Sequence, residues 1–296
     1  MFELKSSLEE TFQSWSKPSS DSETNKCDNA QRMIKDAIKN SDVLNKYNIE
    51  IIPKGSYYNN TNVRLNSDVD IAVMLKDVFF ASYPNGKSQN DFGNISSDYK
   101  FEEYRADVEQ AMIEKFGDTN IEFGNKSIKV HSNSYRVDAD VVPCFEHRRY
   151  SENGHYVSGT QFISKLTREN VTNFPKQHYT NGVNKNIDTS KRYKKVVRIL
   201  KRLRYKMISD GYDFPNISSF LIESLVWNVP NKFFNNPSLT EDVKSAFDYL
   251  IEKTSYYDSC KDWGEVSDLL YLFNYERKYN CNDVNKFLIE AYSYLF

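Results

Sequence analysis

The sequence has few cysteines and no long apolar run. Its four cysteines among 296 residues are scattered without C-x-x-C spacing. We therefore expect reduced thiols and neither a disulfide framework nor a zinc site. No stretch approaches the roughly eighteen apolar residues of a transmembrane helix, and the first residues do not resemble a signal peptide. These absences predict a cytoplasmic protein with no membrane partner.

The chain also lacks an excess of charge of one sign. It has 39 Lys and Arg against 41 Asp and Glu, a formal net charge of −2. Such a balance gives no overall basic field that would attract long nucleic acid or a membrane surface. Its basic residues are instead clustered, which indicates a local anionic ligand.

Two aspartates stand directly before the most apolar run of the first half. Asp68 and Asp70 precede the residues 71–75, Ile-Ala-Val-Met-Leu. In a strand, residues two apart point to the same face, so the two carboxylates should project side by side. Carboxylates so placed repel each other, and Mg²⁺ prefers such hard oxygen ligands together with phosphate oxygens and water. A solvated strand edge is the alternative explanation for the dipeptide alone.

A third carboxylate comes from a second strand, and a phosphate-binding turn precedes the first. Residues 135–145 alternate and then become apolar, with Asp138 and Asp140 on one face, so either could complete a metal site. We expect Pro143 to end this strand, since proline cannot donate to a ladder. Upstream, Gly55 and Ser56 supply a backbone and a hydroxyl able to approach phosphates closely.

These motifs together resemble a known superfamily. Gly-Ser, a loop, Asp-Val-Asp-Ile and then Asp-Val-Val-Pro are similar to the nucleotidyltransferase core of polymerase-β-like enzymes. More narrowly, they resemble the bacterial CD-NTase family, relatives of cyclic GMP-AMP synthase and oligoadenylate synthase. The resemblance implies that Asp140, which is followed by two apolar residues and proline, is the third metal ligand, with Asp138 as the runner-up. It also implies an α+β fold with a polymerase-β-like core, a mixed sheet and a following helical lobe.

The organisation of the chain agrees with two lobes. Strand and helix patterns mix up to about Tyr156, after which strand signals fade. We therefore predict a core lobe over 1–158 and a helical lobe over 159–296, with the active site between them. The polar residues 172–186 are interpreted as a loop. Its Asn173 and His178 could hold a base, or the loop could be an ordinary connector.

A basic helix over 191–207 is the second strong element. It contains no acidic residue, and Lys194, Arg198 and Lys201 recur at helical spacing beside an apolar face. Like charges so placed repel by a few tenths of a kcal/mol per pair unless an anion compensates, and a triphosphate would do so. A solvated basic face is the alternative. In the family, the basic residues bind phosphate and a serine at the start of the next helix approaches it, which makes Ser218 or Ser219 a candidate.

The predicted reaction is nucleotidyl transfer between NTPs, with ATP expected among them. Asp68, Asp70 and Asp140 would hold two Mg²⁺ ions, for which Mn²⁺ could substitute. The resemblance implies a cyclic di- or trinucleotide second messenger of anti-phage (CBASS) signalling and a cyclic-nucleotide-responsive effector. We expect a monomer that needs no long nucleic acid. The alternatives are a linear transferase acting on an RNA 3′ end or a protein side chain, and a non-catalytic nucleotide sensor.

Overall fold

The computed structural model describes residues 2–18, 20–63, 68–214, 216–273 and 279–296. Residues 64–67, part of the loop predicted between Ser56 and Asp68, lie outside this description. The chain divides into two compact units, each discontinuous in sequence. The sheet unit comprises Ser20–Tyr58 and Arg64–Pro175, and the helical unit comprises Met1–Ser19, Asn59–Val63 and Lys176–Phe296.

The sheet unit is built on a mixed sheet with the strand order β1-β2-β5-β4-β3. The central pair β2 and β5 is parallel, and the other neighbours are antiparallel. Strands β6 and β7 extend the sheet beside the second half of β5. The bounds are β1 Ile49–Lys54, β2 Val69–Ser82, β3 Ile121–Phe123, β4 Ile128–Val130, β5 Ala139–Tyr150, β6 Tyr156–Ile163 and β7 Asn170–Asn173.

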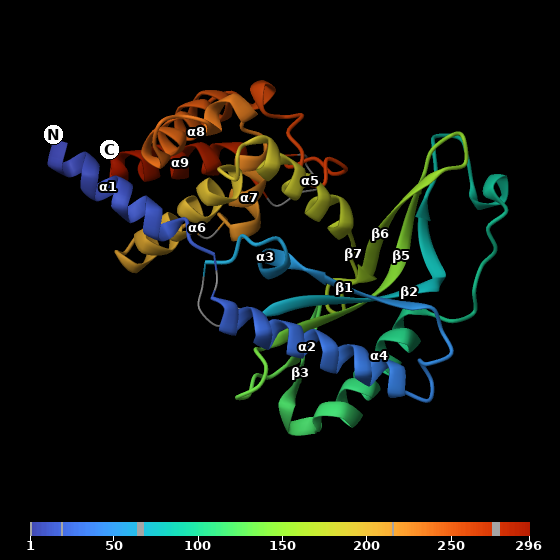
Figure 1. Ribbon diagram of the computed structural model, residues 1–296. Helices are drawn as coiled ribbons and strands as arrows, with labels where there is room; N and C mark the ends of the chain where they lie inside the picture. Colours follow the sequence, from blue (N-terminus) through green and yellow to red (C-terminus); the bar gives the residue numbers. More distant parts are fainter. Residues whose placement is uncertain (1, 19, 64–67, 215, 274–278) are drawn as a thin grey trace. The chain divides into compact units, whose positions relative to one another are not determined.

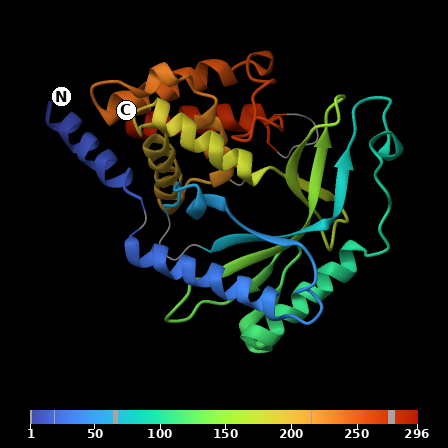
Figure 2. The ribbon, with the colours of Figure 1, turned by 45° about the vertical axis from the view of Figure 1, so that its right-hand side comes forward.

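Two helices cover one face of this sheet, α2 (Asp21–Asn40) and α4 (Phe101–Phe116), which pack against each other (Figures 1 and 2). Their apolar sides and the run Ile71–Leu75 of β2 are buried in one core. Tyr104 of α4 donates a hydrogen bond to the carbonyl of Val73, 2.9 Å away. Burial of this run fixes the start of β2, and therefore the position of Asp70, the second residue of the strand.

Strand β5 is longer than the sequence predicted, because it continues through Pro143 to Tyr150. The expectation that Pro143 ends the strand is wrong. Pairing with β4 stops at Val141 and pairing with β6 starts at Phe145. One side of β5 is therefore unpaired at residue 143, where a residue without an N–H is tolerated.

The helical unit has its core around α6 (Tyr193–Ser209), whose apolar side is fully buried. Glu9 of α1 accepts hydrogen bonds from the backbone N–H of Thr240 (2.8 Å) and from its hydroxyl (2.7 Å), which joins α1 to the start of α8. The other helices of this unit are α1 Phe2–Trp15, α5 Pro175–Asp188, α7 Ser219–Trp227, α8 Leu239–Thr254 and α9 Cys281–Leu295, with 3₁₀ turns at Asn231–Phe234 and Tyr257–Ser259. The sheet unit also contains the short α3 Gly55–Tyr58 and 3₁₀ turns at Gln89–Phe92 and Asp118–Asn120.

The α+β prediction agrees with this architecture, but the two units differ in extent from the predicted lobes. Residue 158 lies inside β6, and α1 groups with the helical unit. The segment 172–186, predicted as a loop, is the end of β7 and most of α5. Pro175 is the first residue of α5, the helical position where its missing N–H costs nothing. Among the described residues, no helix is long and apolar enough to cross a membrane.

Candidate active site

Four charged residues form one row across the sheet. Asp70 of β2 is in register with Asp140 of the parallel strand β5. On the outer sides, Lys54 of β1 is in register with Asp70, and Lys129 of β4 with Asp140. Neighbouring strands lie about 4.8 Å apart, so the row Lys54–Asp70–Asp140–Lys129 places two carboxylates side by side between two cations.

Gly55 approaches this row closely, directly after β1. Its φ is +75°, and an ideal Cβ at this position would lie 1.9 Å from a carboxylate oxygen of Asp70. Any other residue would displace that carboxylate, which explains the glycine. Ser56 follows it in the half-buried turn α3. The structure therefore brings the predicted Gly-Ser turn to the predicted acids.

Asp68 and Asp138 share a cation at the edge of the row. The Lys129 ammonium lies 3.2 Å from Asp68 and 3.5 Å from Asp138. Asp138 also accepts a hydrogen bond from the backbone N–H of Ser132, in the turn between β4 and β5. These contacts lower the pKa of Asp138, although burial opposes the shift. Asp138 thus stabilises the turn, and Asp140 is the acid in register with Asp70.

The electrostatics of the paired acids favour a bound cation. Burial raises the pKa of Asp70, and the charges of Asp140 and Asp68 raise it further against the opposing effect of Lys54. The pKa of Asp140 is raised by burial and by Asp68, while the Ser127 hydroxyl, 3.2 Å away, opposes the shift. In the described residues, no three His, Cys, Asp or Glu side chains are arranged to hold a metal ion as they stand. The donor set itself, carboxylate oxygen, suits Mg²⁺.

The predicted basic residues of α6 lie in the helical unit and are largely buried. The Arg198 guanidinium donates to the backbone carbonyls of Ser16 (2.7 Å) and Asn60. Burial lowers the pKa of Arg198 to about 10. The Lys194 ammonium lies 5.9 Å from the centre of the Tyr179 ring, and burial lowers the pKa of Lys194 as well.

Lys201 belongs to a buried cluster around Glu223 of α7. The carboxylate of Glu223 accepts hydrogen bonds from the Lys201 ammonium (2.6 Å) and the Thr61 hydroxyl (2.7 Å), and its other oxygen lies 3.0 Å from Nε2 of His178. Burial alone would raise the pKa of Glu223, but Lys201 and His178 hold it well below its usual range. We call Lys201, Glu223, Thr61 and His178 the Glu223 cluster.

The remaining candidates have structural contacts of their own. Ser218 caps α7 by accepting from the N–H of Leu221 (3.1 Å) and lies 3.0 Å from the Tyr279 hydroxyl. The Ser219 hydroxyl lies 3.0 Å from that of Tyr205. Asn173 ends β7, and its carbonyl accepts a bond from the Thr160 hydroxyl at 3.4 Å.

Comparison with known proteins identifies the family. Residues 180–296 match the family model of the cGAS/DncV-like nucleotidyltransferase C-terminal helical domain. The chain is 47% identical over 289 residues to the cyclic dipyrimidine nucleotide synthase CdnE of Cecembia lonarensis, covering 97% of this chain and 98% of that protein. It belongs to the CD-NTase family. A second CdnE of the same description, from Legionella pneumophila, is 41% identical and covers 97% of each chain.

Solved structures of CD-NTases agree with this assignment. The chain superimposes with a TM-score of 0.80 on the cyclic dinucleotide synthase CdnE of Elizabethkingia meningoseptica, solved with GTP and Apcpp, at 34% identity and with 97% and 98% of the two chains covered. The CdnE c-UMP-AMP synthase of Rhodothermus marinus, solved with Apcpp and Upnpp, gives a TM-score of 0.85 at 27% identity, with 96% of each chain covered. This CD-NTase is therefore a nucleotidyltransferase.

Sequence reasoning missed Lys54, Lys129 and Glu223 in this CD-NTase. Lys129 could have been found, because it falls opposite Asp140 once the turn 131–138 is taken as the hairpin joining their strands. Glu223 gave no such signal. It stands in the apolar sequence 217–230, and only the tertiary fold brings it to Lys201, 22 positions away.

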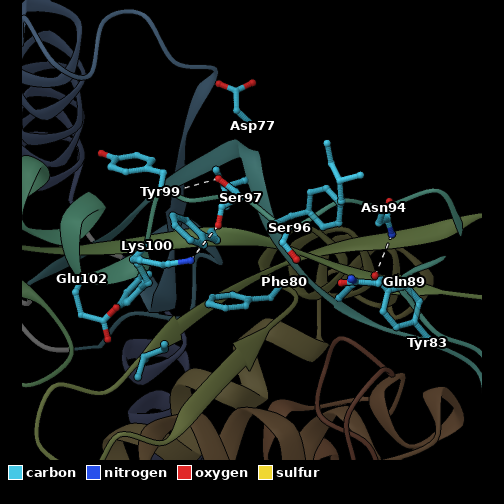
Figure 3. A pocket seen from close by; sticks show the side chains of 17 residues that line it. Asp77, Phe80, Tyr83, Gln89, Asn94, Ser96, Ser97, Tyr99, Lys100 and Glu102 are labelled. Atoms are coloured by element: carbon cyan, nitrogen blue, oxygen red, sulfur yellow. Dashed lines mark hydrogen bonds between the residues drawn. The ribbon is translucent and has the colours of Figure 1, made fainter.

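The sheet unit has a further hollow, away from the acids. It has a volume of about 470 Å³ and is lined by the second half of β2, residues of the segment 83–100, the first two residues of α4, Phe145 and Ile163 (Figure 3). Asp77 at its edge is seven residues along β2 from Asp70, roughly 20 Å in an extended strand. Within it, Lys100 donates to the Ser97 carbonyl and Asn94 to the Tyr83 hydroxyl. This pocket is separate from the row of acids.

Proposed function

We propose that this CD-NTase joins two nucleoside triphosphates into a cyclic dinucleotide, with Asp68, Asp70 and Asp140 as its catalytic acids. The observation that carries the proposal is the register of Asp70 with Asp140, with Asp68 two residues before Asp70. A ribose hydroxyl of one nucleotide attacks the α-phosphate of the other, and pyrophosphate leaves. A second, intramolecular transfer closes the ring.

The three acids would hold Mg²⁺, or Mn²⁺ in its place. Such ions lower the pKa of the attacking hydroxyl and neutralise charge on the leaving pyrophosphate. The residues of the chain position the reactants. Gly55 has no side chain, so its backbone can lie directly against the Asp70 carboxylate, and Ser56 offers a hydroxyl to phosphate. Lys54 and Lys129 limit the repulsion between the carboxylates.

Among the basic residues of α6, Lys194 is our first candidate for binding phosphate. Arg198 and Lys201 are engaged by backbone carbonyls and by Glu223. Both contact the segment 59–63, which leads in sequence to Asp68. Their proposed role is therefore to position that segment. Asn173, Ser218 and Ser219 remain candidates for contacts with the nucleotides.

The proposed substrates are pyrimidine nucleotides. Two relatives at 47% and 41% identity are cyclic dipyrimidine nucleotide synthases, whereas those at 36% are a cyclic GMP-AMP synthase and a cyclic dipurine nucleotide synthase. ATP paired with a pyrimidine nucleotide is the second candidate, since the Rhodothermus marinus relative is a cyclic UMP-AMP synthase. We further propose a cytoplasmic monomer whose product activates a cyclic-nucleotide-responsive effector in anti-phage signalling.

Product analysis tests the proposal. The chain is incubated with all four NTPs, and with each omitted in turn, in the presence of Mg²⁺ or Mn²⁺. The phosphatase-resistant products are identified by mass spectrometry. A cyclic dinucleotide that disappears without UTP or CTP supports the proposal. Label transferred to added RNA or protein would support the linear transferase instead. No product with any NTP pair and either metal would support the sensor.

A further inference from the structure

Two cysteines far apart in sequence meet in the helical unit. The sulfur atoms of Cys260 and Cys281 lie 2.9 Å apart, although the residues are 21 positions apart. Both side chains are buried in the same apolar core. This separation is shorter than the usual contact distance between two non-bonded sulfur atoms. The sulfurs need to approach each other by less than 1 Å to reach the roughly 2.05 Å of a disulfide bond.

The surroundings of the two thiols differ. Cys281 is the first residue of α9, after the N-cap Asn280, and Cys260 follows the 3₁₀ turn Tyr257–Ser259. A helix N-terminus stabilises a thiolate. The neighbouring Cys260 thiol, which can donate to that thiolate, lowers the pKa of Cys281, although burial opposes the shift. As a thiol, Cys281 donates to the Thr254 carbonyl at 3.2 Å.

We propose that Cys260 and Cys281 are an oxidation site, where a hydroperoxide converts the two thiols into a disulfide. The Cys281 thiolate attacks hydrogen peroxide, which breaks the O–O bond and gives a sulfenic acid and water. The Cys260 sulfur then attacks the sulfenic sulfur, the S–S bond forms, and a second water leaves. Two thiols are oxidised, one peroxide is reduced to two waters, and a thiol reductant reverses the reaction.

The other two cysteines are not suited to this chemistry. Cys27 and Cys144 belong to the sheet unit, and burial raises their pKa to about 11 and about 12. Neither has a sulfur partner among the described residues. They provide an internal control, because oxidation specific to the Cys260–Cys281 pair leaves them as thiols.

The cross-link would join the start of α9 to the segment that follows α8. The same junction is already held by Asn285, whose side-chain amide donates to the Ile251 carbonyl and the Thr254 hydroxyl. A disulfide that fits existing packing constrains the unfolded chain without straining the fold. The disulfide would close a loop between residues that are 21 positions apart. For a loop of this length, we expect the melting temperature of the helical unit to rise by about 5–10 °C.

The test treats the full chain with equimolar to tenfold hydrogen peroxide and then alkylates it under denaturing conditions. We expect a mass loss of about 2 Da, two alkylated thiols in place of four, and a Cys260–Cys281 cross-linked peptide that dithiothreitol removes. Cys281→Ala and Cys260→Ala should each abolish the cross-link, whereas Cys144→Ala should retain it. Circular dichroism of the untreated variants checks that they fold.

Four alkylated thiols after peroxide treatment would overturn the proposal, as would stable addition of oxygen without a cross-linked peptide. A cross-link that forms equally with Cys27 or Cys144 would also overturn it, because the pair would then have no special reactivity. None of these outcomes bears on nucleotide synthesis, so the proposal stands or fails separately from the proposed function.

Discussion

The ammonium of Lys201 lies 2.6 Å from a carboxylate oxygen of Glu223, and the two side chains are only 2% and 5% exposed. This ion pair joins α6 to α7 and, through the Thr61 hydroxyl, holds the segment that precedes Asp68 in sequence. A buried pair need not stabilise a fold relative to apolar residues. Removing one partner, however, leaves the other charge buried and unpaired.

Glu223→Ala should therefore destabilise the helical unit by about 3–5 kcal/mol, measured by urea unfolding. The matched control is the exposed pair Lys206–Asp210 at the end of the same helix, 2.6 Å apart. Lys206→Ala should leave stability nearly unchanged, because solvent screens that pair and Asp210 keeps its hydrogen bond from the Tyr294 hydroxyl. Equal losses in the two variants would contradict the special role of the Glu223 cluster.

The same cluster predicts a pH dependence. Lys201 and His178 hold the pKa of Glu223 well below its usual range despite the opposing effect of burial. The resulting stability is fully present above the unfolded pKa, about 4.3, and is lost as pH falls below it, by at most about 1.4 kcal/mol per pH unit. Unfolding measured between pH 3 and 6 should show this loss in wild type, and Glu223→Gln should show less of it. Parallel curves for the two proteins would refute the assignment.

For the proposed catalytic acids, we expect mutations to change activity without lowering stability. Asp70→Asn and Asp140→Asn should each reduce synthesis by more than about 100-fold, since each removes a proposed metal ligand. Because burial and neighbouring acids raise the pKa of both groups, their charged forms oppose folding, and the variants should melt at the same temperature as wild type or higher.

Asp138→Asn is the control for these variants, because its carboxylate contacts Ser132 and Lys129 and is not in register with Asp70. It should keep most of the activity and lose some stability. Full activity of Asp140→Asn together with an inactive Asp138→Asn would show that the assignment of the third acid is reversed.

Local sequence patterns predicted the strands that carry Asp70 and Asp140, whereas the contacts of the basic residues of α6 depend on the tertiary fold. The apolar run 71–75 and the alternation before Pro143 were sufficient to place Asp70 and Asp140 on strands, because strand periodicity is local. The buried roles of Arg198 and Lys201 were not accessible in this way. Helical spacing shows that basic residues share a face, but it does not show that backbone carbonyls or a glutamate from another helix meet that face.

Lys129 should compete with divalent cations for the acids. Its ammonium lies 3.2 Å from Asp68, and this contact is the main reason why its pKa is raised. Lys129→Met removes the competing charge, so the Mg²⁺ concentration for half-maximal synthesis should fall by about two- to fivefold, the range expected for a partly exposed ion pair. Stabilisation by Mg²⁺ in a thermal melt gives a second readout. Lys126 is an exposed lysine in the turn between β3 and β4, and Lys126→Met should change neither the Mg²⁺ requirement nor the stabilisation by Mg²⁺. A higher Mg²⁺ requirement for Lys129→Met would contradict the competition.

Gly55 and Gly86 allow a backbone effect to be separated from an effect on the acids. Both have a positive φ, +75° and +77°, so alanine should destabilise each by roughly 1 kcal/mol. A Cβ at Gly86 meets nothing within 4 Å, whereas one at Gly55 would lie 1.9 Å from the Asp70 carboxylate. That carboxylate is the end of a side chain and can swing away, so the clash should cost activity more than stability. Gly55→Ala should thus lose most of its synthetic activity, while its melting temperature stays within a few degrees of that of Gly86→Ala. Gly86→Ala should stay active. Comparable activity of the two variants would show that the close approach of Gly55 to Asp70 has no part in the reaction.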